Sequence, residues 1–285
     1  MIVDAHHHLW DPAARRHDWL AGRPRLRRAF GLEDYAKASA VAGVTASVLV
    51  QVLASSPETE EFLATAAATA GQTPEVAGVV GWVDLTANDV PDELDRLRGL
   101  PGGDRLVGIR HLVQDEPDPN WLGRPDVGRG LRAVGAAGLV YDLLVRPPQL
   151  PAALRVTAEL DEVRFVLDHA GKPEIGAGRT EPWAGLIAEL AALPNLTCKL
   201  SGLVTEAGPA WTRESFEPYV DRLLESFGPG RLMFGSDWPM GTIAASYTEV
   251  ATLTRELLEP RLSEDERAAV FSRTAATVYR LKVPG

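Results

Sequence analysis

Short runs of apolar, mostly β-branched residues alternate with longer amphipathic segments along this chain of 285 residues. Such runs predict strands, and segments with apolar positions three or four apart predict helices. The predicted strands are residues 2–8, 46–52, 76–83, 106–112, 139–145, 164–169, 196–200 and 231–235. The predicted helices are residues 32–42, 58–70, 92–98, 127–136, 148–159, 182–192, 213–226, 247–258 and 263–278.

Strand followed by helix, eight times over, is typical of a closed parallel (β/α)8 barrel, the TIM barrel. The strand runs are apolar on both faces, as strands between a packed interior and an outer helix layer require. An open doubly wound sheet is the alternative, but no G-x-G-x-x-G follows the first strand, where its dinucleotide site would lie. No linker or repeat divides the chain, so we expect one barrel domain over residues 1–285.

A long loop is predicted after the first strand. Residues 11–30 are rich in arginine and have no periodic apolar face. In a barrel, the loops that follow the strands lie at the end where active sites form. We therefore expect this loop to lie over the active-site end.

Composition narrows the range of partners. The 29 basic residues against 39 acidic ones give a net charge of −10, which disfavours binding to nucleic acid or to an anionic membrane surface. The chain has no secretory signal pattern and no apolar run long enough to span a membrane, so we expect a cytoplasmic protein. The single cysteine, Cys198, cannot form an intrachain disulfide or a thiolate cluster, and on its buried strand it is interpreted as packing.

The segment VDAHHHLW near the N-terminus holds three consecutive histidines. An affinity-tag remnant is one explanation, but the run is short and lies within a predicted strand. Side chains alternate along a strand, so Asp4, His6 and His8 should share one face while His7 faces the helix layer. His6 and His8 would then point into the barrel mouth, where Asp4 could orient a histidine ring. The alternative is a fortuitous run of surface histidines.

Two further strand ends carry polar residues that can reach the same mouth. RFVLDHAGKP ends a predicted strand with His169, and RLMFGSDWP ends another with Ser236 and Asp237. Imidazole and carboxylate groups are zinc ligands, and an aspartate can also act as general base toward water. Taken singly, each has another interpretation: Asp168 or Asp237 as a helix N-cap, and His169 as a hydrogen-bonded core residue. Together at the ends of three strands, they indicate a site.

The segments DAHHHLWDP, GIRHLVQDEPDPNWL, YDLLVRP, VLDHAGKP, CKLSGL and MFGSDWP, in this order, resemble the amidohydrolase-related lactonases of the amidohydrolase superfamily. This group includes L-fuconolactone and L-rhamnonolactone hydrolases and 2-pyrone-4,6-dicarboxylate lactonase. The resemblance extends from residue 4 to about residue 240. It implies a (β/α)8 barrel that hydrolyses a sugar-acid or related lactone in carbohydrate metabolism.

The resemblance also implies roles. Asp237 would take a proton from water, and His6, His8 and His169 would polarise the lactone carbonyl, directly or through a zinc ion that they hold with Asp237. The superfamily's two-metal members have a lysine or glutamate on strand four and further histidines on strands five and six. This chain lacks that pattern, so we expect one divalent ion or a metal-independent reaction.

Other polar and aromatic residues at strand ends are candidates for substrate binding. The planar guanidinium of Arg110 could donate hydrogen bonds to a carboxylate or hydroxyl of the substrate, although a structural ion pair is the alternative. For the remaining candidates, packing or surface exposure is the alternative. The full set is Arg110, His111, Gln51, Trp82, Gln114, Tyr141 and Lys172. Strand alternation indicates that Arg110 and His111 cannot both face inward unless the strand ends or bulges there.

Two other functions are compatible with the sequence. Zinc-dependent nonoxidative decarboxylases of the same superfamily use a similar H-x-H, histidine and aspartate set, but normally keep a further histidine where this chain has LTCKLSG. A barrel that binds a sugar acid without catalysis is the other possibility, against which the four residues at the mouth argue.

Overall fold

A parallel barrel forms the centre of the molecule. Over residues 1–282, which the computed structural model describes, eight strands form one sheet in sequence order, and each pair of consecutive strands is parallel. They are β1 (Ile2–His7), β2 (Val44–Val50), β3 (Glu75–Gly81), β4 (Leu106–His111), β5 (Val140–Leu143), β6 (Arg164–Leu167), β7 (Leu196–Leu200) and β8 (Leu232–Phe234). All eight predicted strands are present within a few residues of the expected bounds.

The sheet closes on itself between β1 and the residues that follow β8. The amide of Asp237 donates to the carbonyl of His6 at 2.8 Å, and the amide of His8 donates to the carbonyl of Trp238 at 2.7 Å. The predicted (β/α)8 barrel is thus confirmed. These hydrogen bonds also hold the end of β1 against the segment that carries Asp237.

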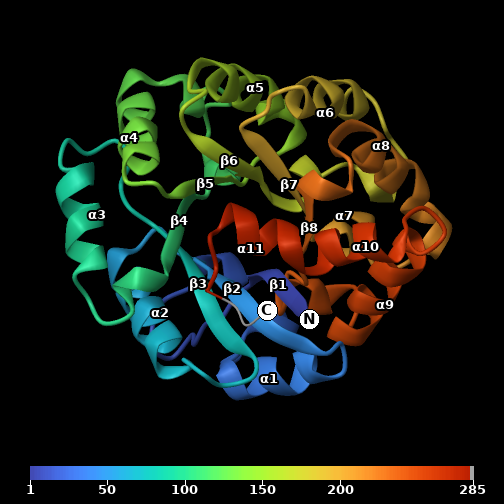
Figure 1. The fold of residues 1–285 in the computed structure, drawn as a ribbon, viewed down its shortest axis with the longest axis horizontal. Coiled ribbons are helices and arrows are strands. Elements are labelled where there is room, and N and C mark those ends of the chain that lie inside the picture. The colour runs from blue at the N-terminus through green and yellow to red at the C-terminus, as the bar shows by residue number, and fades with distance from the viewer. Residues whose placement is uncertain (283–285) are drawn as a thin grey trace.

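Helices surround the barrel, as Figure 1 shows. They are α1 (Leu32–Ala40), α2 (Ser56–Ala68), α3 (Val90–Arg98), α4 (Pro125–Ala136), α5 (Leu150–Glu159), α6 (Trp183–Ala191), α7 (Leu203–Ala207), α8 (Glu217–Phe227), α9 (Tyr247–Leu258), α10 (Glu264–Ala268) and α11 (Thr274–Val278). A π-helical turn, Ala269–Arg273, joins α10 to α11. Only the short α7, among the described helices, lies in a segment where the sequence predicted none. None of the helices over residues 1–282 is long and apolar enough to cross a membrane.

The two ends of the barrel interior differ in polarity. At the end that α10 and α11 cross in Figure 1, apolar strand residues such as Val3, Val166 and Met233 form one buried cluster with Ala275 and Tyr279. Toward the other end the interior becomes charged, with Arg110, Asp142, Asp168 and Lys199 each at most 2% exposed. A buried charge is tolerated only where it is paired. The barrel therefore has one apolar, closed end and one polar end.

Candidate active site

A β-bulge in β1 determines which way its polar residues face. Asp4 pairs with Ser47 of β2, but His7 pairs with Leu49, so β1 has one residue more than β2 over this stretch. Asp4 consequently faces the helix layer, where it accepts hydrogen bonds from the hydroxyls of Tyr35 and Tyr247 at 3.0 and 2.9 Å. The prediction that Asp4 shares a face with His6 and His8 and orients a ring was wrong, because simple alternation does not hold across a bulge.

The histidine run itself divides as predicted. His7 is buried in the helix layer, where its ring stacks on Tyr35 with centroids 3.8 Å apart and its Nε2 lies 3.0 Å from Ser47 Oγ. His6 and His8 lie on the other side of the strand, with their Nε2 atoms 3.1 Å apart. Two imidazoles therefore converge inside the barrel mouth, and the third supports the packing of α1.

Left-handed backbone presents the other two members of the site. β6 ends at Leu167, two residues earlier than predicted, and His169, Ala170 and Lys172 all have φ between 52° and 55°. Asp237 has φ 53°. L-residues seldom adopt this conformation, and such strain is concentrated at functional sites. The two left-handed segments turn the side chains of His169 and Asp237 toward His6 and His8.

The four side chains meet around one carboxylate oxygen. Asp237 Oδ1 lies 3.4 Å from His8 Nε2 and 3.9 Å from the Nε2 atoms of both His6 and His169. Burial lowers the pKa of His6 well below its usual value and that of His169 to about 4. Burial pushes the pKa of Asp237 upward, but His169, His8 and Lys172 outweigh it and keep this pKa below its usual value. At neutral pH the site thus holds an ionised carboxylate beside the neutral rings of His6 and His169.

A second layer of charged side chains lies directly beneath these rings. Arg110 Nη1 donates to Asp168 Oδ2 at 2.9 Å, and Lys199 Nζ lies 3.0 Å from Asp168 Oδ1 and 2.6 Å from Asp142 Oδ2. His6 Nδ1 lies 3.2 Å from Lys199 Nζ. Two cations face two carboxylates, so the layer is balanced in charge. Lys199, His6 and Arg110 together outweigh burial and hold the pKa of Asp168 well below its usual value.

The sequence reasoning missed Lys199 and Asp142 as parts of this layer, although a signal was present. Each is a charged residue in the middle of an apolar strand run, LTCKL for Lys199 and VYDL for Asp142. Charged residues in fully covered strands must find a partner of opposite charge. Pairing such residues between strands would have indicated both.

A cavity of about 510 Å³ opens above the site. Its lining includes His8, His169 and Asp237, and three of the predicted substrate residues, Arg110, Gln114 and Lys172. The loop of residues 11–30 contributes Trp19 and Arg23, which confirms its predicted place over the active-site end. Trp19, Arg23 and Arg146, which also lines the cavity, were not among the predicted site residues. Loop residues of this kind carry no strand pattern by which the sequence could place them.

Four predicted substrate residues lie elsewhere. Trp82 Nε1 donates to His111 Nδ1 at 3.0 Å, and His111 also stacks on Trp121 with centroids 4.4 Å apart, so the two form a packing cluster outside the cavity lining. Arg110 and His111 face opposite sides of β4, in keeping with strand alternation.

Tyr141 and Gln51 have structural partners as well. Tyr141 packs in the core outside the barrel, with its ring 6.2 Å from that of Phe165. Gln51 is fully buried and accepts a hydrogen bond from Arg110 Nη2 at 2.9 Å. Trp82, His111, Tyr141 and Gln51 therefore do not line the cavity, and Gln51 instead accepts a hydrogen bond from Arg110.

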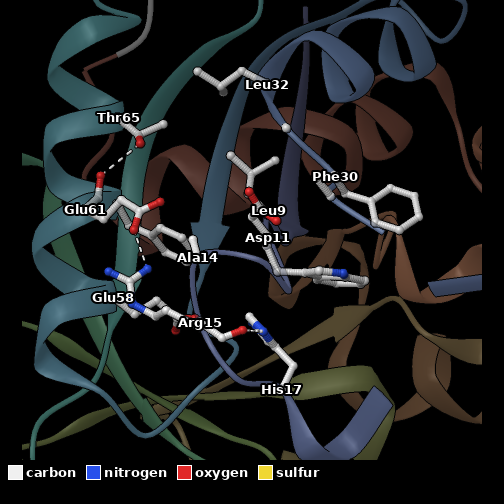
Figure 2. A pocket seen from close by; sticks show the side chains of 14 residues that line it. Leu9, Asp11, Ala14, Arg15, His17, Phe30, Leu32, Glu58, Glu61 and Thr65 are labelled. Carbon is white, nitrogen blue, oxygen red and sulfur yellow. Dashed lines mark hydrogen bonds and ion pairs between the residues drawn. The ribbon is translucent and has the colours of Figure 1, made fainter. Parts of the chain in front are cut away.

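A second cavity, of about 290 Å³, lies between the start of the 11–30 loop and α2 (Figure 2). Arg15 reaches across it to pair with Glu61, and the lining also includes Glu58. None of the four converging residues lines this cavity. The cavity above the four converging residues is therefore the candidate active site.

The donor set suits a divalent metal. His6, His8 and Asp237 offer ligand atoms that all lie within 4.8 Å of one another, and His169 Nε2 faces the same carboxylate oxygen. His8 Nδ1 lies 2.8 Å from the carbonyl of Val50, which can only accept, so the proton of a neutral His8 ring is on Nδ1 and the Nε2 lone pair is free to coordinate. Histidine nitrogens and carboxylate oxygens are among the ligands that zinc takes in proteins.

Comparisons with known proteins agree with this fold. A sequence model of the family described as amidohydrolase matches residues 3–281. A Burkholderia ambifaria protein named L-fucono-1,5-lactonase is 38% identical, covering 99% of this chain and 96% of its own. A Burkholderia multivorans protein of the same name is 39% identical, covering 99% and 97%. A crystal structure of a B. multivorans amidohydrolase with bound zinc superposes with a TM-score of 0.91 at 40% identity, covering 99% of each chain.

Proposed function

The chain belongs to the amidohydrolase family, and from this premise we propose that it is an enzyme that hydrolyses a sugar-acid lactone, with L-fucono-1,5-lactone as the first candidate substrate. The observation that carries the proposal is the position of three imidazole nitrogens within 3.9 Å of one buried carboxylate oxygen. This arrangement lies beneath a cavity of about 510 Å³, within the usual volume range of small-molecule sites.

Asp237 is assigned the general base. Its ionised carboxylate takes a proton from water as the water oxygen attacks the lactone carbonyl carbon. The negative charge that develops on the carbonyl oxygen would be stabilised by N–H donors from the Arg110 guanidinium and, in the metal-free site, from the rings of His6 and His169. The ring C–O bond then breaks, and the leaving oxygen recovers the proton from Asp237. The product is an open-chain hydroxy acid.

The cavity walls would bind the sugar hydroxyls. Lys172 and Gln114 line the cavity, and Lys172 Nζ lies 3.6 Å from Glu206 Oε1. Amide, ammonium and carboxylate groups match the donors and acceptors of a polyhydroxylated ring. We assign specificity among lactones to these residues, together with Trp19 and Arg23 of the loop.

A zinc ion would be held by His6, His8, His169 and Asp237. When bound, such an ion polarises a carbonyl and lowers the pKa of water. The other contributions belong to the chain: Arg110 is fixed by Asp168 and Gln51, and the left-handed turns aim His169 and Asp237.

The test is an acid-release assay over a panel of 1,4- and 1,5-aldonolactones, with and without a chelator. We expect turnover of at least one deoxysugar lactone, and at least a 100-fold loss of kcat in Asp237→Asn. Asp115→Asn is the matched control for loss of a carboxylate in the same cavity, since Asp115 forms none of the ion pairs with histidine that Asp237 forms. Failure to open any lactone, with release of carbon dioxide from an aromatic carboxylate instead, would identify a decarboxylase.

A further inference from the structure

The wall of the active-site cavity is not uniform in polarity, and the proposed reaction does not explain the difference. The loops after β6 and β7 contribute polar side chains, among them Lys172, Thr205 and Glu206. The loops after β4 and β5 contribute both polar and apolar side chains. The segment after β8 contributes Met240 and Ile243, which are both apolar. Beyond the general base itself, the β8 side of the mouth is therefore apolar.

The backbone fixes this apolar side relative to the general base. Met240 and Ile243 are the two ends of a 3-10 turn that begins three residues after Asp237. The amide of Gly241, within this turn, donates to the carbonyl of Asp237 at 2.9 Å. Both apolar side chains are partly exposed to the cavity that they line. Met240 therefore has a fixed place beside the carboxylate that takes the proton from water.

Trp10 extends the apolar side. Trp10 lines the same cavity, and its Nε1 donates at 3.1 Å to a carbonyl of the turn Pro24–Leu26, which lies beside the turn Met240–Ile243. Because its N–H has this main-chain partner, the rest of the indole offers the cavity an apolar surface. Trp19 packs edge-on against Trp10, with ring centroids 5.0 Å apart. Arg23, which also lines the cavity, donates to the carbonyl of Trp19.

The two sides of a 1,5-lactone ring differ in the same way. On one side of the carbonyl carbon is C2, which has a hydroxyl group. On the other side is the ring oxygen, which leads to C5 and its substituent, C6. With the carbonyl carbon at Asp237, a C2 hydroxyl against the apolar side would lose its hydrogen bonds, and so would a hydroxyl on C6. A methyl group at C6 has no hydrogen bonds to lose, so the C5 side of a 6-deoxysugar lactone fits there.

We propose that Met240, Ile243 and Trp10 form a subsite for the C6 methyl group of a 6-deoxysugar lactone, and that Met240 determines the preference over a lactone with a hydroxyl on C6. The inference deepens the proposed hydrolase function and rests on it for the position of the carbonyl carbon at Asp237. The preference also acts on binding. It can therefore be measured separately from turnover.

The kinetic test compares L-fucono-1,5-lactone with L-galactono-1,5-lactone, which differs from it by a hydroxyl on C6. We expect kcat/KM to favour the first by about 10- to 100-fold, as apolar pockets do against an added hydroxyl. Met240→Gln, whose amide can bond to that hydroxyl, should reduce this ratio at least about fivefold, whereas the apolar Met240→Leu should keep it within about threefold. Since each variant is compared on two substrates, any loss of folded protein cancels.

Leu112→Gln is the matched control. Leu112 lines the same cavity from the loop after β4, and the strands follow one another in sequence order, so this loop lies across the mouth from the segment after β8. The same amide placed there should leave the ratio within about threefold of the parent's. Equal kcat/KM for the two lactones in the parent, or equal ratios in Met240→Gln and Leu112→Gln, would overturn the subsite and leave the hydrolase function in place.

Binding of the two corresponding 1,5-lactams repeats the comparison without turnover, because a ring amide resists hydrolysis far better than a ring ester. Titration calorimetry should show the same preference for the 6-deoxy compound and the same loss of it in Met240→Gln. A parent that opens neither lactone but binds the lactams with this preference would refute the hydrolase function and support the subsite. A parent that opens no lactone and binds neither lactam would refute both.

Discussion

At the residue scale, His6 and His7 are adjacent in sequence but face opposite sides of β1, so we assign His6 to the active site and His7 to packing. His7 stacks on Tyr35 in the helix layer, whereas His6 faces Asp237 in the mouth. We expect His7→Ala to lower the free energy of unfolding by about 2 kcal/mol, through lost packing, and to leave kcat within a few-fold. His6→Ala should instead lower kcat about 100-fold or more. Urea unfolding and lactone assays on both variants check this, and equal losses of kcat would contradict the assignment of faces.

Gly202 is a residue whose missing side chain makes room for His169. It has φ 67°, and a Cβ built there would lie 2.6 Å from His169 Nδ1. Gly202→Ala should therefore displace the imidazole and lower kcat at least about tenfold, since small misplacements of catalytic groups are costly. Gly178→Ala is the matched control: Gly178 has φ 64° and open space around its Cβ position. The two variants should lose similar stability, of about 1 kcal/mol. Equal activity in both would exclude a positioning role for Gly202.

At the scale of elements, the sequence predicts the strands and helices well and their irregularities poorly. The period of the apolar runs locates β1 and β6 within two residues. It cannot show the bulge that turns Asp4 outward or the left-handed residues that begin at His169, because both depend on hydrogen bonds to other elements. The positions of His6, His8, His169 and Asp237 at strand ends were therefore predictable, whereas the outward face of Asp4 and the backbone turns at His169 and Asp237 were not.

Glu58 links the start of α2 to the loop after β2. Its ionisation is expected to make the stability of the protein depend on pH. Its carboxylate accepts hydrogen bonds from the amides of Val52 and Leu53 at 2.7 and 2.9 Å. Burial raises the pKa of Glu58 from 4.5 to about 7, in spite of these hydrogen bonds. Between those pH values the folded chain keeps a proton that the unfolded chain has lost, so stability falls as the pH rises.

Glu58→Gln should remove this dependence, because the amide oxygen can accept the same two hydrogen bonds and does not ionise. Below about pH 4.5, we expect the free energy of unfolding to change with pH in the same way in the parent and the variant. By about pH 8 the free energy of unfolding of the variant, relative to that of the parent, should have risen by up to about 3 kcal/mol, because each pKa unit corresponds to about 1.36 kcal/mol. Urea unfolding of both proteins at pH 4.5, 6 and 8 measures the difference, and parallel pH curves would contradict the raised pKa.

At the scale of the whole molecule, the barrel separates stability from chemistry along its axis. The apolar end, closed by α11, contains Met233 and Tyr279, and the polar end contains the converging histidines and Asp237. A site built at the ends of several strands depends on the closed barrel to bring its parts together. His6 and Asp237 are far apart in the sequence, and they meet because β1 is hydrogen-bonded to the segment after β8.

β8 and the segment after it offer the sharpest test of this separation, since Met233 lies in the apolar cluster and Asp237, four positions later, lies at the polar end. Met233 is fully buried among apolar residues, so Met233→Ala should lower the free energy of unfolding by about 2–5 kcal/mol. At a temperature where the variant remains folded, kcat and KM should stay within about twofold, because the cavity left behind lies at the closed end. Asp237→Asn should show the reverse, with kcat lost and stability nearly unchanged or raised, since strained active sites commonly reduce stability. Loss of kcat in folded Met233→Ala would mean that the two ends of the barrel are coupled.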